Sequence, residues 1–159
     1  MFLPESVKLT EVGLRDGLQS VAKPISSKIK LNATQQLVDA GLKQIQVTSF
    51  VHPDWVPQMA DAEAVCVGLQ EAEDVVFSGL VLNAKGVERA AAAGLKRVEA
   101  SISTSDTHSR KNANMSLDEA MVHLKKMVTL AHDSGIEARG GLQSVWGCVY
   151  DGYPSDERI

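Results

Sequence analysis

An arginine and an aspartate stand side by side between two glycines near the start of the chain, in the run GLRDGLQ at residues 13–19. The carboxylate of Asp16 is a hard oxygen ligand of the kind that Mg²⁺ and Mn²⁺ prefer. The guanidinium of Arg15 can donate paired hydrogen bonds to a carboxylate or to a developing enolate. An internal ion pair that closes the turn explains the same two residues. The residue types alone leave both interpretations open.

A second polar segment, residues 103–114 (STSDTHSRKNAN), combines His108, Arg110 and Lys111 ahead of a predicted helix. Positive side chains together with free backbone N–H groups suit a phosphate, such as the diphosphate of coenzyme A. We therefore expect Lys111 and Asn112 to contact an anionic substrate. The alternative is a loop that is merely solvated.

A third segment, residues 48–59, contains two prolines and Trp55, which predicts a stiff loop that either lines a pocket or packs on its own aromatic ring. Cys66 and Cys148 lie far apart without metal-ligand spacing, so we expect both to be small buried apolar residues. The chain has no P-loop, no GxGxxG after a strand and no GxSxG. Nucleotide hydrolysis and α/β-hydrolase chemistry therefore lack their usual motifs.

The scaffold for these segments is predicted by alternating β-rich and helical patterns. Strands are expected over residues 7–12, 44–50, 75–82, 97–103 and 137–145. Helices are expected over residues 26–40, 61–72, 86–93 and 116–134, the last beginning with a capping box at Ser116 and Glu119. About five parallel strands with four intervening helices indicate a single α/β domain over residues 1–159. An open doubly wound sheet and part of a (β/α)8 barrel both fit this pattern.

Bulk composition narrows the class of protein. The 159 residues are 44% apolar and 23% charged, with a formal net charge of -4, so no overall basic surface for nucleic acid is expected. No apolar run approaches the roughly 20 residues that span a bilayer, so we expect no membrane partner. Residues 1–6 lack the pattern of a secretory leader, and the chain has only two cysteines. These features predict the cytoplasm.

Three runs resemble the hydroxymethylglutaryl-CoA lyases, a group within the wider pyruvate-carboxyltransferase-like barrels. These runs are EVGLRDGLQ at 11–19, TSFV with WVPQM at 48–59, and GCVYDG at 147–152. The resemblance covers almost the whole chain in order. It implies the N-terminal portion of a (β/α)8 TIM barrel, whose closed form takes about 250 residues.

The resemblance also implies an activity: divalent-metal-dependent retro-Claisen cleavage of a 3-hydroxyacyl-CoA to a ketone or oxo acid plus an acyl-CoA, with Mg²⁺ or Mn²⁺ as cofactor. It implies that Asp16 is a metal ligand and that Arg15 stabilises the enolate. Glu11 and Gln19 would belong to the polar shell of the site, and Ser49 would line its wall.

One departure bears on the chemistry. The lyases usually carry glutamate where this chain has Gln46, a catalytic position by resemblance, and a neutral amide cannot act as a base. A related metal-dependent aldolase or Claisen condensation on 2-oxo acids therefore stays open. The family completes its metal site with an HxH pair and an asparagine that these residues lack, which leaves a third hypothesis, a catalytically incomplete half-barrel that self-associates. A homo-oligomer is expected because an open edge strand invites pairing.

Overall fold

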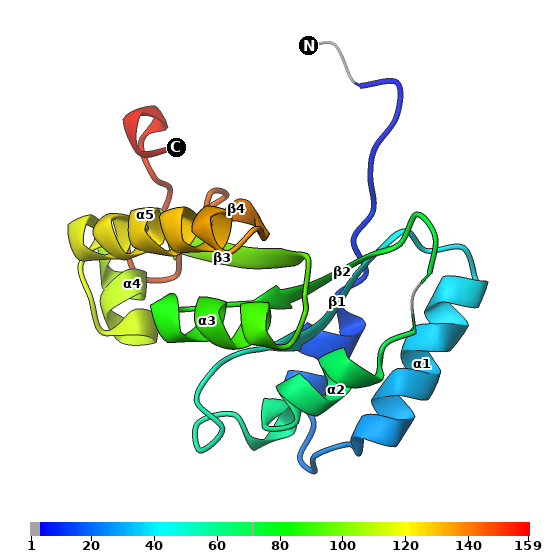
Figure 1. Ribbon diagram of the computed structural model, residues 1–159. Coiled ribbons are helices and arrows are strands. Elements are labelled where there is room, and N and C mark those ends of the chain that lie inside the picture. Colours follow the sequence, from blue (N-terminus) through cyan, green and yellow to red (C-terminus); the bar gives the residue numbers. More distant parts are fainter. Residues whose placement is uncertain (1–3, 71) are drawn as a thin grey trace.

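The computed structural model describes residues 4–70 and 72–159, and within them a four-stranded parallel sheet runs through the centre (Figure 1). The strands are β1 (Gln44–Ser49), β2 (Val76–Leu80), β3 (Arg97–Ser103) and β4 (Glu137–Gln143). They pair in the order of the chain, β1-β2-β3-β4. A doubly wound sheet reverses its strand order at a switch point, so the described strands follow the barrel pattern instead.

Helices connect the strands. Among the described residues they are α1 (Ser27–Asp39), α2 (Ala62–Gly68), α3 (Ala84–Ala92), α4 (Asp106–Ala113) and α5 (Leu117–Asp133). The predicted capping box is confirmed, because the Ser116 side chain accepts the Glu119 N–H and the Glu119 carboxylate accepts the Ser116 N–H. Gly94 and Gly135 take positive φ just after α3 and α5, where only a residue without Cβ is unstrained.

The two faces of the sheet differ in polarity. Ile45 and Val47 on β1 and Val98 and Ala100 on β3 are buried against the helices, in two clusters of apolar residues. The alternate positions carry polar side chains, for example Ser78, whose hydroxyl donates to Glu99 Oε1 at 2.8 Å. This alternation follows from the two-residue period of a strand. The polar face corresponds to the interior of a barrel.

A register shift in β1 interrupts that alternation. Gln46 pairs with Ser78, whereas Thr48 pairs with Gly79 and Ser49 with Leu80, so β1 advances two residues against one of β2. Such a bulge changes which face the following residues occupy. It places Ser49 on the same polar face as Gln46, while Thr48 turns to the helix side and its hydroxyl lies 3.9 Å from the Met59 sulfur.

The strand predicted over residues 7–12 is wrong except at one residue. Glu11 forms an isolated parallel bridge with Ile45, and no strand extends from it. Val7 and Leu9 are 73% and 70% exposed, so the apolar side chains of this segment do not pack against the rest of the described structure. The described residues therefore hold four strands rather than the five expected.

The polar loop predicted over residues 103–114 is also corrected, because residues 106–113 form α4. The Ser105 hydroxyl accepts the His108 N–H at the helix start, and Arg110 Nε donates to Asp106 Oδ2 at 2.6 Å one turn apart. Asn114 takes φ +53 and ends the helix. Five helices therefore occur where four were expected among the described residues.

Other boundaries differ by a few residues. The helix predicted over 61–72 ends at Gly68, a weak helix former, and the backbone is extended at Leu69. Residue 71 of that prediction lies outside the described residues, as do residues 1–3 of the stretch used to predict the absence of a leader. The fifth predicted strand stops at Gln143 because Ser144 has φ +64. Among the described residues, no helix is long and apolar enough to cross a membrane.

Candidate functional site

The GLRDG turn is anchored to the first strand of the sheet. Residues 13–17 form one π-helical turn, η1 (Gly13–Gly17), a rare conformation that occurs often at functional sites. Just before it, the Glu11 N–H donates to the Gln44 carbonyl at 2.9 Å and the Gln46 N–H donates to the Glu11 carbonyl at 2.8 Å. Leu14 is buried in the cluster around Ile45. Local sequence and one edge contact together fix the turn against β1.

Arg15 is hydrogen-bonded to two other predicted site residues. Its Nη1 donates to Asp16 Oδ1 at 2.6 Å, and its Nε donates to Gln46 Oε1 across 31 positions of sequence. The Arg15 side chain is only 18% exposed, whereas that of Asp16 is 68% exposed. The ion pair that closes the turn is therefore present. The same arrangement leaves Asp16 Oδ2 without a hydrogen-bond partner in the described residues and open to solvent.

The Glu11 side chain bonds within its own turn. Its Oε1 accepts the Gly13 N–H at 2.5 Å, which stabilises the start of η1. No hydrogen bond or ion pair joins its carboxylate to Arg15 or Gln46 in the described part of the chain. Glu11 therefore supports the turn by both its backbone and its side chain.

Gln19 and Ser49 each bury a polar atom. Gln19 Oε1 and Ser49 Oγ have no hydrogen-bond partner among residues 4–70 and 72–159. A buried polar atom without a partner costs about 1–3 kcal/mol and marks a place where a ligand or water is accommodated. Ser49 is fully buried and lies on the polar face with Gln46, as the bulge in β1 dictates.

Lys111 and Asn112 are not brought to this cluster. On α4, Lys111 Nζ lies 4.2 Å from the centre of the Tyr150 ring, and the Asn112 amide contacts His108 Nε2 at 3.3 Å. The start of α4 is also occupied, because the Thr107 N–H donates to Asp151 Oδ2 at 3.1 Å and the Ser105 hydroxyl caps the next turn. The contact of Lys111 and Asn112 with an anionic substrate stays a prediction.

The two cysteines differ. Burial raises the pKa of the Cys66 thiol to about 12, which makes it the inert apolar residue that was expected. Cys148 is half-exposed, so its predicted burial is wrong. A hydrogen bond with the Ser105 hydroxyl, and then the Tyr150 N–H, lower the pKa of Cys148. The same hydroxyl, followed by Thr107, lowers the pKa of Asp151.

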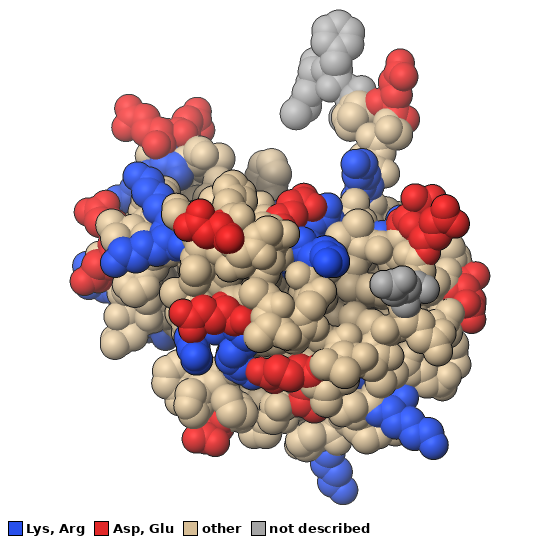
Figure 2. All heavy atoms as spheres, viewed as in Figure 1, with Lys and Arg blue, Asp and Glu red and all other residues tan. Residues whose placement is uncertain are grey.

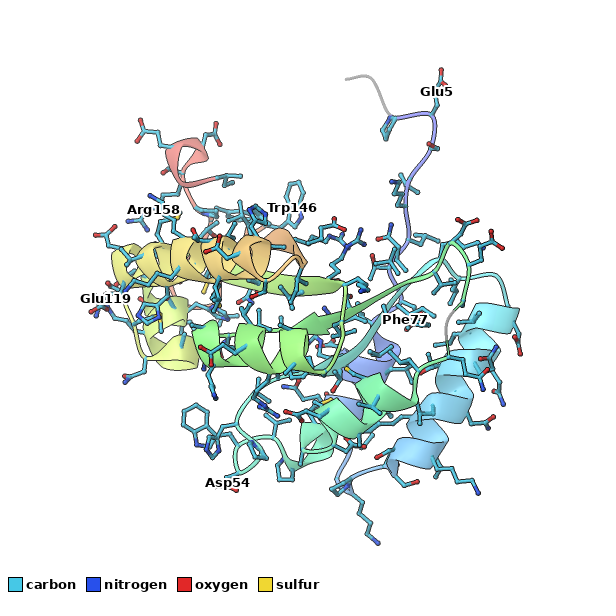
Figure 3. The ribbon with its side chains drawn as sticks, in the orientation of Figure 1. Glu5, Asp54, Phe77, Glu119, Trp146 and Arg158 are labelled. Atoms are coloured by element: carbon cyan, nitrogen blue, oxygen red, sulfur yellow. The ribbon has the colours of Figure 1, made fainter. Side chains whose placement is uncertain are left out.

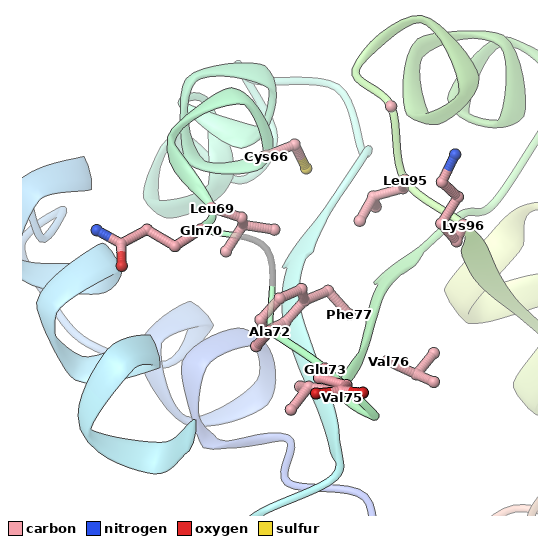
Figure 4. Close-up of a pocket in the computed structure, with 11 residues that line it drawn as sticks. Cys66, Leu69, Gln70, Ala72, Glu73, Val75, Val76, Phe77, Leu95 and Lys96 are labelled. Carbon is pink, nitrogen blue, oxygen red and sulfur yellow. The ribbon is translucent and has the colours of Figure 1, made fainter. Parts of the chain in front are cut away.

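A hollow of about 770 Å³ lies at the other end of the sheet. Cys66, Leu69, Phe77 and Leu95 line it, with Lys96 at its edge, as Figure 4 shows. These residues precede or begin β2 and β3, whereas functional residues of parallel α/β proteins gather where strands end. Figure 3 labels Phe77 on the side of the molecule that carries α1 and α2, and Trp146 on the side that carries α5. We do not assign the reaction to this hollow.

Charge gives no simple pointer to a binding surface. On the face shown in Figure 2, basic and acidic side chains are interspersed rather than gathered by sign. No group of three or more His, Cys, Asp or Glu side chains able to hold a metal ion occurs in the described parts of the chain. Asp16 is thus a single candidate ligand. The Arg15 cluster is the best candidate site because it joins a π-turn to the buried Gln46 amide of β1.

Known proteins are similar to this chain over most of its length. A family model described as HMGL-like matches residues 6–148. The chain is 39% identical to the mitochondrial hydroxymethylglutaryl-CoA lyase of Macaca fascicularis, over 99% of this chain and 48% of that protein. It is 40% identical to the cytoplasmic 3-hydroxy-3-methylglutaryl-CoA lyase of Danio rerio, over 99% of this chain and 47% of that protein.

Solved structures agree. The hydroxymethylglutaryl-CoA lyase of Pseudomonas aeruginosa superposes with a TM-score of 0.92 at 36% identity, covering 98% of this chain and 52% of that one. An HMG-CoA lyase from Acinetobacter baumannii, solved with coenzyme A and 3-methylmalate, gives a TM-score of 0.89 at 28% identity, covering 95% and 49%. The four parallel strands are thus part of a (β/α)8 barrel. The chain spans about half the length of the curated relatives it matches.

The family model covers nearly all of the sequence, and the four strands, the π-turn and the Arg15 cluster all lie within the matched region. The chain therefore belongs to the HMGL-like family.

Proposed function

We propose that this protein works as a carbon–carbon lyase that cleaves a 3-hydroxyacyl-CoA of the hydroxymethylglutaryl-CoA type. One observation carries the proposal: the Arg15 guanidinium is held by Asp16 and Gln46 at the edge of the polar face. Family membership supports it, and the relatives reported above are lyases named for this substrate class rather than 2-oxo-acid condensing enzymes.

The proposed reaction is a retro-Claisen cleavage. A base takes the proton of the tertiary hydroxyl, its oxygen becomes the carbonyl of the product ketone, and the bond between C2 and C3 breaks. The electron pair of that bond moves onto the thioester as an enolate, which then takes a proton to give the acyl-CoA. Negative charge therefore develops on the thioester oxygen. A fixed N–H donor aimed at that oxygen stabilises the transition state more than the ground state.

Arg15 is our candidate for that donor. Its Nε and one Nη1 hydrogen bond are made within the protein, which orients the planar guanidinium, and its Nη2 has no partner in the described residues. Gln46 is neutral and cannot take the hydroxyl proton, so in this chain we assign it the role of holding Arg15. Glu11, Gln19 and Ser49 remain proposed members of the surrounding wall, the last two through their unpartnered oxygens.

The donor set around Asp16 is too small for a divalent cation. Mg²⁺ and Mn²⁺ take about six oxygen ligands, and Asp16 offers one solvent-facing carboxylate oxygen. The described residues thus do not fit a complete metal centre. We propose Asp16 as one ligand of Mg²⁺ or Mn²⁺.

Partner and location follow the same logic. We propose an acyl-CoA substrate, since a relative has been solved with coenzyme A, and a homo-oligomer, since β4 pairs only with β3 among the described strands. Trp146 and Tyr153, both exposed beyond that strand, would be covered by association. We also propose a cytoplasmic location, the one named for the Danio rerio relative, although the Macaca fascicularis relative is named mitochondrial.

The test is cleavage of 3-hydroxy-3-methylglutaryl-CoA by the purified protein, with Mn²⁺ and with chelator. Asp16→Asn keeps the shape and the hydrogen bond from Arg15 but removes the charge, so turnover should fall by orders of magnitude. Asp106→Asn, an aspartate paired with an arginine on α4, is the matched control and should keep its turnover. Equal turnover of Asp16→Asn and the unmodified protein contradicts the proposal.

A further inference from the structure

Arg89, on α3, connects three parts of the fold outside the Arg15 cluster. Its Nε and Nη2 donate to the two carboxylate oxygens of Glu63 on α2, at 2.6 and 3.0 Å. Its Nη1 donates to the Val51 carbonyl at 3.0 Å, and the guanidinium lies 5.5 Å from the centre of the Phe50 ring. Four separate contacts thus converge on one partly buried side chain, which is 23% exposed.

The segment that Arg89 holds follows directly on Ser49. Phe50 and Val51 are buried, and the Phe50 N–H is bonded to the Leu80 carbonyl at 2.8 Å. Gly86, three residues before Arg89, lets the helix approach closely, because a Cβ there would lie 3.1 Å from the Phe50 carbonyl oxygen. The direction of the Ser49 side chain is thereby tied to the position of α3.

The chemistry of these contacts requires a guanidinium. A carboxylate held on two parallel N–H groups, a carbonyl and an aromatic face match the planar fork of arginine, and an ammonium satisfies only part of this set. The Glu63 carboxylate is also adapted to its partner, since the hydrogen bond from Arg89 lowers the pKa of Glu63.

We infer that Arg89 is a positioning residue that fixes the Phe50–Val51 backbone and, through it, the Ser49 hydroxyl at the wall of the site. The contacts stand without any assumption about the reaction, whereas the catalytic consequence rests on the proposed function. Arg89 touches none of the residues assigned to chemistry. It acts only through the loop.

Hydrogen exchange separates this role from general stability. In Arg89→Ala, the amides of Phe50, Trp55 and Val56 should exchange at least about tenfold faster, while amides in the middle of α5 keep their rates. Lys85→Ala is the matched control, because Lys85 forms an ion pair with Glu88 on the exposed side of the same helix. Its loop amides should be unchanged. Equal acceleration in α5, or none in the loop, overturns the inference.

Kinetics test the catalytic consequence. Arg89→Ala should lower kcat several-fold while KM for the thioester changes little, and Arg89→Lys should recover part of the loss, because only the carbonyl contact is restored. Unchanged kcat in Arg89→Ala with a loosened loop overturns the positioning role. An unmodified protein that cleaves no thioester defeats the proposed function instead, and the exchange rates then still decide whether Arg89 holds the loop.

Discussion

The turn η1 and the helix α4 are both polar, and both lie beside strands of the same sheet. Each carries an arginine and an aspartate close together, but the arginines differ in the partners that they bind. In η1, Arg15 reaches out of its own turn to Gln46, and Asp16 keeps one oxygen free of partners in the described residues. In α4, Asp106 pairs with Arg110 and His108 with Asn112, each one turn apart.

This difference shows how a charged segment that stabilises a helix can be distinguished from one that orients a reacting group. Pairs four residues apart satisfy a helix from within and contribute only about 0.2–0.5 kcal/mol each. A long-range contact from a mostly buried guanidinium instead orients a donor relative to another element, which is what a reacting group requires. Polar composition alone does not distinguish the two cases. The four predictions below test this contrast between η1 and α4.

The largest effect is expected from removing the guanidinium of η1. Arg15→Met keeps most of the stem of this largely buried side chain but removes the donor. We expect kcat for thioester cleavage to fall by about 10²–10³, the usual loss for one oxyanion donor. Arg110→Met on α4 should stay within about twofold in the same assay. Comparable losses in the two variants would erase the distinction drawn here.

Adding a charge beside Arg15 should sharpen the contrast. Gln46→Glu places a carboxylate where Arg15 Nε already donates, so the cluster changes from neutral to a net charge of −1. Mn²⁺ affinity, measured by titration calorimetry, should rise about fivefold, since one charge a few ångströms away contributes on the order of 1 kcal/mol. Asn112→Asp on α4 should leave it unchanged. If Gln46→Glu leaves the Mn²⁺ affinity unchanged, the result argues against Asp16 as a metal ligand.

Removing a cap should weaken α4 and leave η1 intact. The Ser105 hydroxyl accepts the His108 N–H and donates to Asp151, so Ser105→Ala should lower the free energy of unfolding by about 1 kcal/mol in urea titrations. Ser20→Ala beside η1 removes one exposed hydrogen bond to the Asp16 carbonyl and should change it by less than about 0.5 kcal/mol. A larger loss of unfolding free energy in Ser20→Ala than in Ser105→Ala would show that η1, not α4, depends on local caps.

The smallest effect concerns acid. Hydrogen bonds from Ser105 and Thr107 lower the pKa of Asp151 in the folded protein below its unfolded value of about 3.9. A depressed pKa stabilises the fold above the unfolded value, and that stabilisation disappears as the pH falls through the folded value. The Thr107 amide resonance should therefore shift below about pH 4, and Asp151→Asn should remove the shift. A shift of equal size in the variant would assign it to another group.

Much of the scaffold was predictable because its signals are local. The bounds of β3 match the prediction at both ends, and α5 begins at the predicted capping box. The triplet AGL occurs at residues 40–42 and 93–95, and its glycines Gly41 and Gly94, both with positive φ, follow the ends of α1 and α3. Caps, turns and apolar periods act within a few residues of chain, so a sequence displays them directly.

The sequence showed that Arg15 and Asp16 are neighbours, and it indicated two roles for them, a metal and enolate site or an ion pair that closes the turn. It did not show which of these roles the pair has. The contact with Gln46 spans 31 positions and depends on the pairing of Glu11 with β1. Arg89 gave no sequence signal at all, because its four contacts come from two segments that lie 26 to 39 positions away in the sequence, α2 and the residues that follow β1. Residues 7–12 have the composition of a strand, but only Glu11 pairs with a neighbouring strand, so no strand forms there.

The sequence by itself determined the alternation of strands and helices, the ends of α1, α3 and α5, and the presence of a cation beside an anion at residues 15 and 16. Only the tertiary structure decided which side chains share a face. The bulge in β1 exists relative to β2, and it is this pairing that turns Ser49 rather than Thr48 toward Gln46. Register is a relation between two segments, so one segment read alone cannot specify it.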